Sequence, residues 1–65
     1  MEHYVDIDGL LHKHRITMAE LARRTGIERP NLTRIKRNQT ATLGSISRIA
    51  QALNIRDINE IVKVK

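Results

Sequence analysis

The stretch TMAELARRTGIERPNLTRIKRN, residues 17–38, decides the fold because it holds the start and end signals of two short helices separated by a turn. Thr17 and Glu20 have the spacing of a capping box, in which each side chain hydrogen-bonds the backbone amide of the other residue. Arg23 and Arg24 suit the C-terminal end of this helix, and Gly26 suits the left-handed residue that follows it. The sequence therefore predicts a first helix of the pair over about residues 18–25.

The second helix of the pair is predicted to begin just before Pro30, since a missing amide hydrogen costs little in a first turn. At about 100° per residue, Leu32 and Ile35 share one side of this helix and predict its buried face. The outer face carries Pro30, Thr33, Arg34 and Arg37. Asn38 tolerates left-handed backbone and is predicted to end the helix, which leaves a basic outer face free to bind.

The segments on either side predict three further helices and two strands. Asp8 is predicted to cap a helix that runs to about residue 15, and Thr42 to cap another whose apolar stripe is Ile46, Ile49, Ala50 and Leu53. Residues 56–61 continue a helical period, and the short alternating segments 4–7 and 62–65 predict terminal strands that pair with each other. We thus expect one all-α, five-helix domain over residues 1–65, with a small terminal β-ribbon.

Composition limits both the core and the partners. The chain of 65 residues has no cysteine and one aromatic residue, Tyr4, so its core must be aliphatic and without disulfides. Residues 15–37 carry seven Arg and Lys against two Glu, which equals the net charge of +5 of the whole chain. Focused positive charge suggests a polyanion partner. On charge alone, a solvated basic face explains the pattern equally well.

Several functional classes are not expected from the sequence. There is no apolar run of the roughly 18 residues that a membrane span needs and no signal peptide, so we expect a cytoplasmic, nucleoid-associated protein without membrane contact. His12 and His14 diverge by about 200° around a helix, so no metal site is expected. Phosphate loops, clustered catalytic carboxylates and activated nucleophiles are absent, and neither enzymatic activity nor a cofactor is predicted.

An ordered set of residues between about 10 and 61 resembles the phage repressor and Cro-type (Xre-like) helix-turn-helix family. The resemblance rests on Leu21 and Ala22, on Thr25, Gly26 and Ile27 at the turn, on Leu32 and Ile35, and on the stretch 43–53 before Asn54 and Ile55. It implies that the second helix of the pair, at about residues 29–37, enters the major groove of double-stranded DNA. The chain departs from the family pattern at Met18, where a DNA-contacting Gln is frequent, at the outward Pro30, and at Asn38, where Gly is usual.

Carried over residue by residue, the resemblance implies two sets of DNA contacts. The expected base contacts are Arg29, Asn31, Thr33 and Arg34. Their chemistry agrees, since Arg binds guanine, Asn binds adenine, and a Thr methyl contacts the thymine methyl. The expected backbone contacts are Thr17, Met18, Arg23, Arg24, Lys36, Arg37, Asn38 and Thr40. Such phosphate contacts position a protein on DNA without reading its sequence.

The function that the resemblance implies is sequence-specific transcriptional regulation, as a bacterial or phage repressor. A single module buries roughly 600 to 1,000 Å² of surface, so a homodimer on a palindromic site is expected. Three dimer surfaces stay open: the tail 62–65, the fifth helix with Ile58 and Ile61, and the first strand with Tyr4 and Val5. The alternative function is an antitoxin or adaptor that binds a protein partner. Such a protein does not need a basic outer face, and this favours DNA.

Overall fold

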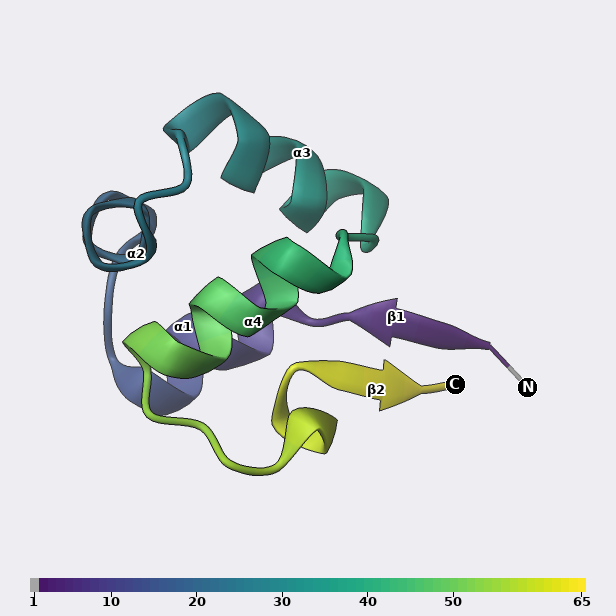
Figure 1. The fold of residues 1–65 in the computed structure, drawn as a ribbon. Coiled ribbons are helices and arrows are strands. Elements are labelled where there is room, and N and C mark those ends of the chain that lie inside the picture. Colours follow the sequence, from purple (N-terminus) through teal and green to yellow (C-terminus); the bar gives the residue numbers. More distant parts are fainter. Residues whose placement is uncertain (1) are drawn as a thin grey trace.

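The computed structural model describes residues 2–65 and contains four α-helices and two short strands in this range. The elements are β1 (His3–Val5), α1 (Ile7–His14), α2 (Met18–Thr25), α3 (Arg29–Asn38), α4 (Leu43–Ala52), the 3-10 helix η1 (Ile58–Glu60) and β2 (Val62–Val64). Figure 1 shows α3 along one side of the molecule, with α2 at its N-terminal end and the two strands near the chain termini. The mostly helical fold is as predicted, whereas the number of helices is not.

Helix α1 begins earlier than the sequence suggested. Its cap is Asp6, whose carboxylate accepts a hydrogen bond from the Gly9 amide at 3.0 Å. The prediction that Asp8 caps this helix is therefore wrong. Because β1 ends at Val5, Asp6 is the residue at which the chain leaves the strand, and a start at Ile7 places Ile7 and Leu10 together in the core.

Helix α2 has the predicted bounds but only half of the predicted capping box. The Thr17 hydroxyl accepts from the Glu20 amide at 3.1 Å, as expected. The Glu20 carboxylate turns toward Arg24 instead of back to Thr17, and accepts a hydrogen bond from it at 2.8 Å. Gly26 ends the helix with φ +73° and donates its amide to the Ala22 carbonyl, which confirms the left-handed ending.

Helix α3 ends one residue later than predicted. Asn38 is still helical, and the left-handed residue is Gln39, with φ +59°. The Gln39 amide donates to the Ile35 carbonyl, while its own carbonyl accepts from the Val5 amide at 2.9 Å. The later ending thus connects the C-terminal end of α3 to β1, a long-range contact that the local sequence does not contain.

The C-terminal part of the chain differs most from the predicted secondary structure. Thr42 caps α4 by accepting from the Ser45 amide, as predicted, and Asn54 follows this helix with left-handed backbone, φ +55°. The predicted fifth helix over residues 56–61 is wrong, because only the three residues of η1 are helical there. Asp57 caps this single turn, and the Ile61 carbonyl that follows accepts from the Asp6 amide at 2.9 Å, which directs the chain into β2.

The two strands form an antiparallel ribbon, as the terminal alternation predicted. Their register pairs His3 with Val64, Tyr4 with Lys63, and Val5 with Val62. The Lys65 ammonium lies over the Tyr4 ring, 5.5 Å from its centroid. The ribbon pairs His3–Val5 with Val62–Val64, and the Val5 amide connects it to Gln39, the residue that follows α3.

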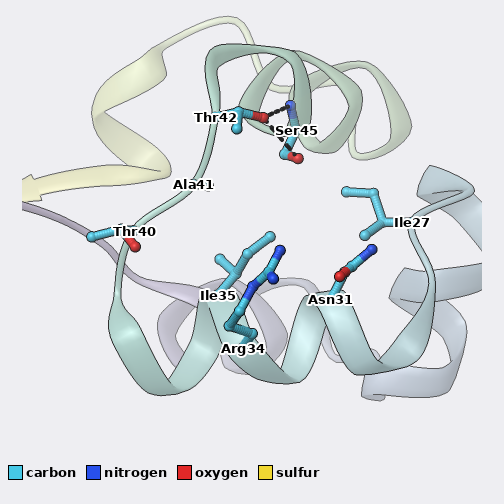
Figure 2. Close-up of a pocket in the computed structure, with 8 residues that line it drawn as sticks. All are labelled: Ile27, Asn31, Arg34, Ile35, Thr40, Ala41, Thr42 and Ser45. Carbon is cyan, nitrogen blue, oxygen red and sulfur yellow. Dashed lines mark hydrogen bonds between the residues drawn. The ribbon is translucent and has the colours of Figure 1, made fainter.

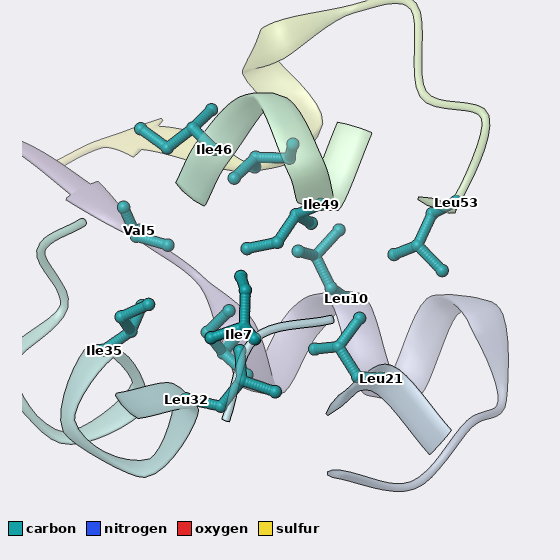
Figure 3. Packing of buried hydrophobic residues seen from close by; sticks show 11 residues of the cluster. Val5, Ile7, Leu10, Leu21, Leu32, Ile35, Ile46, Ile49 and Leu53 are labelled. Atoms are coloured by element: carbon teal, nitrogen blue, oxygen red, sulfur yellow. The ribbon is translucent and has the colours of Figure 1, made fainter. Parts of the chain in front are cut away.

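A single aliphatic core holds these elements together. Among the described residues it comprises Val5, Ile7, Leu10, Leu21, Ile27, Leu32, Ile35, Ile46, Ile49, Leu53 and Ile61. Figure 3 shows side chains from β1 and all four α-helices meeting in this core. Burying a side chain of this size contributes about 1.5 to 3 kcal/mol. Because Leu21 and Leu32 are fully buried, the core fixes α2 and α3 relative to each other.

Candidate nucleic-acid interface

The turn between α2 and α3 is held by a buried hydroxyl. Thr25 Oγ1 donates to the Leu21 carbonyl at 2.8 Å and accepts from the Ile27 amide at 3.2 Å. Gly26 stands between them in left-handed backbone, which costs other residues about 1 to 2 kcal/mol. The turn is therefore fixed at consecutive residues by a hydrogen bond, a left-handed glycine and the buried Ile27 side chain.

The outer face of α3 is exposed and basic, as predicted. Leu32 and Ile35 are buried beneath it. The exposed residues of this face are Arg29, Pro30, Thr33, Arg34 and Arg37, which we call the α3 face. The Thr33 hydroxyl donates to the Arg29 carbonyl at 3.0 Å, so its hydrogen is already used within the helix and its methyl group is available for contact.

The basic residues near α3 fall into two classes. Arg23 and Arg24 share the Glu20 carboxylate at 3.7 and 2.8 Å, and the Lys36 ammonium lies 3.5 Å from Asp8. Within residues 2–65, none of the guanidinium groups of the α3 face, those of Arg29, Arg34 and Arg37, forms an ion pair. The α3 face thus carries three unpaired guanidinium groups, whereas Arg23, Arg24 and Lys36 have carboxylate partners.

A hollow of about 280 Å³ adjoins this face, between α3 and the start of α4. Figure 2 shows the side chains of Asn31 and Arg34 directed into it from α3, opposite Thr42, which caps α4, and Ser45 in the first turn of α4. The Thr42 hydroxyl bonds both the amide and the hydroxyl of Ser45, each at 3.1 Å. Two of the four predicted base contacts therefore point to the same side of the helix.

The hollow also contains residues that sequence reasoning did not assign to the site. Thr42 and Ser45 line it with Ile27 and Ala41. The predicted cap at Thr42 gave the start of α4. The local sequence pattern did not predict that this end of α4 would lie opposite α3. A long-range contact of this kind needs the packed core.

The other residues predicted to contact the DNA backbone lie in three parts of the structure. Thr17 and Met18 lie at the start of α2, where Met18 is half-buried and packs against the core. The α2 arginines lie at its other end. Asn38 and Thr40 are exposed beside the ribbon and line a second hollow of about 290 Å³. Met18 thus contributes packing, in keeping with its departure from the family pattern.

The rest of the described chain shows neither a metal cluster nor a membrane span. Among residues 2–65, no group of three His, Cys, Asp or Glu side chains is placed to hold a metal ion. The His14 Nε2 atom is buried without a hydrogen-bond partner in this range. None of the described helices is long and apolar enough to cross a membrane.

Comparison with known proteins identifies the family. The model of the Cro/C1-type HTH DNA-binding domain matches residues 6–65, which is nearly the whole chain. No curated protein and no solved structure matches it. The chain belongs to the Cro/C1-type HTH DNA-binding domain family, which confirms the resemblance found in the sequence and makes DNA binding the function of the fold.

Proposed function

We propose that this Cro/C1-type domain is a sequence-specific transcriptional repressor that inserts the N-terminal half of α3 into the major groove. The observation that carries the proposal is the α3 face, on which Arg29, Arg34 and Arg37 form no ion pair with the described residues, whereas Arg23, Arg24 and Lys36 do. Bound at an operator, the domain would exclude polymerase by occupancy.

The proposed base contacts divide by chemistry. Arg29 and Arg34 donate to guanine O6 and N7, and Asn31 pairs with adenine N6 and N7. Thr33 offers its methyl group to thymine, in keeping with a hydroxyl that already bonds Arg29. Each good bidentate pair discriminates against a wrong base by roughly 1 to 3 kcal/mol.

The residues proposed to contact phosphates differ in whether they must first break an ion pair within the protein. Arg37 forms no ion pair with the described residues, so it can approach a phosphate directly. Arg24 and Lys36 must first exchange a carboxylate partner, Glu20 or Asp8, for the phosphate. The other members of this set are Thr17 and Met18, through backbone amides at the start of α2, and Arg23, Asn38 and Thr40. We expect Arg37 to contribute most to affinity in this set.

Binding as a homodimer on a palindromic site is part of the proposal, because one module buries little surface. Val5 and Ile61 belong to the core and are not available for an interface. Ile58 and Val64 are each 49% exposed and remain candidates. Pairing between the β2 strands of two copies would place lysines opposite lysines, which is unfavourable, because Lys63 and Lys65 alternate with the valines.

The test is selection of a randomised duplex library on the purified protein at about 150 mM salt, repeated across a salt series. We expect enrichment of a two-fold symmetric site and an affinity that falls steeply as salt rises. Weak, salt-sensitive binding with no enriched site would overturn the proposal. The same protein would then be used to search for a protein partner.

A further inference from the structure

We propose that Glu28 is a further specificity-determining residue, whose carboxylate accepts a hydrogen bond from the N4 amino group of a cytosine. The inference rests on the proposed function, because it concerns the end of α3 that would enter the groove. Glu28 directly precedes Arg29, the first residue of α3. It is the acidic residue next to the α3 face, which otherwise carries unpaired cations.

The carboxylates of the chain are nearly all engaged. Asp6 and Asp57 accept backbone amides as helix caps. Asp8, Glu20 and Glu60 pair with cations. In the part of the chain that the structure describes, the Asp and Glu side chains left without a hydrogen bond or ion pair are those of Glu2 and Glu28. Of these two, only Glu28 adjoins the α3 face.

Glu28 also differs from the other helix caps. The caps of α1, α2 and α4 accept an amide hydrogen with their side chains. Glu28 has extended backbone, φ −61° and ψ 143°, and no hydrogen bond between its side chain and the helix. Its carbonyl accepts from the Leu32 amide at 3.0 Å, so its backbone is fixed while its exposed carboxylate is free.

A free carboxylate at this position weakens binding to any phosphate backbone, because like charges repel. It discriminates between base edges, because an ionised carboxylate only accepts hydrogen bonds. In the major groove, cytosine N4 and adenine N6 donate, while guanine and thymine present acceptors at the corresponding positions. Adenine places its N7 acceptor beside N6 and repels the second carboxylate oxygen. Cytosine is therefore the base that Glu28 selects.

The position of that cytosine follows from chain geometry. Consecutive Cα atoms are about 3.8 Å apart, which is close to the spacing of about 3.4 Å between stacked base pairs. The N-terminal residues of a recognition helix contact base edges. Glu28 and Arg29 should therefore read the same base pair or adjacent ones, so the cytosine lies within one base pair of the guanine bound by Arg29.

The experiment is the library selection repeated with Glu28→Gln, Glu28→Ala and Arg29→Ala, with Glu2→Gln as a control for the loss of one negative charge. We expect Glu28→Ala to lose a cytosine preference of roughly 5- to 150-fold, within one base pair of the position relaxed by Arg29→Ala. Glu28→Gln should shift the preference to adenine, because an amide matches N6 and N7. Glu2→Gln should select the wild-type site.

The outcomes separate this inference from the function on which it rests. If the wild type enriches a site and Glu28→Gln selects the same site with uniformly higher affinity, Glu28 only repels phosphates and the inference is overturned. If the wild type enriches no site, the proposed function itself fails. Thermal melting of each variant establishes that it is folded, and the isosteric Gln variant decides the question should the Ala variant unfold.

Discussion

Two glycines should respond in opposite ways to the same substitution. Gly26 has φ +73°, and an added Cβ would have space, since the nearest atom is an Arg48 guanidinium nitrogen at 3.8 Å. The cost of Gly26→Ala is therefore conformational, about 1 to 2 kcal/mol for left-handed backbone. Gly44 lies in α4, where an added Cβ would meet only the Thr42 hydroxyl at 3.9 Å. Gly44→Ala should stabilise the protein by about 0.5 kcal/mol.

Thermal unfolding followed by circular dichroism measures both effects. For a domain of this size, 1 kcal/mol changes Tm by roughly 4 to 8 °C. We therefore expect Gly26→Ala to lower Tm by about 4 to 16 °C and Gly44→Ala to raise it by about 2 to 4 °C. A Gly26→Ala variant as stable as the wild type would refute the left-handed turn between α2 and α3.

Substitutions at three further positions test the local contacts by denaturant unfolding. Thr25→Val should cost about 1 to 3 kcal/mol because it leaves the buried Ile27 amide without its acceptor, whereas Thr25→Ser, which keeps the hydroxyl, should cost less. Thr17→Ala removes the α2 cap and should cost about 1 kcal/mol; no loss would mean that the amide is equally well bonded to water. Lys13→Ala breaks the exposed pair with Glu60 and should cost less than about 1 kcal/mol, with an effect that disappears at high salt.

The sequence predicted the helix-turn-helix pair well because its signals are local. The cap Thr17, the left-handed Gly26 and Pro30 in the first turn of α3 each act over one helical turn, and all three have the predicted positions. The pairing of the terminal strands was also predictable, since alternation at both ends leaves each segment needing a partner.

The sequence-based predictions were wrong where contacts between distant parts of the chain determine the local structure. Asp6 and Asp8 are equally good caps by residue type, and the end of β1 selects Asp6. Gln39 takes the left-handed conformation because its carbonyl bonds Val5 in β1. The helical period of residues 56–61 yields to β2, whose pairing with β1 requires the chain to turn at Ile61.

In the candidate site, too, the features set by local sequence were predictable and those set by long-range packing were not. The exposed basic face of α3 followed from helical periodicity alone. Two features depend on how α1, α3 and α4 pack and were not predictable from the sequence. These are the ion pair between Lys36 and Asp8 and the hollow lined by Arg34 and Ser45. Which of the cations are unpaired, the observation on which the proposed function rests, therefore required the structure.

The measurement that tests the central claim most directly is a comparison of Arg34→Ala with Arg37→Ala on the selected duplex and on random DNA. We predict that Arg34→Ala relaxes the preference at one base position by roughly 1 to 3 kcal/mol. Arg37→Ala should weaken binding to both duplexes alike and reduce the salt slope by about one. If both variants instead weaken binding equally on every DNA sequence, α3 does not read bases through Arg34, and the account is contradicted.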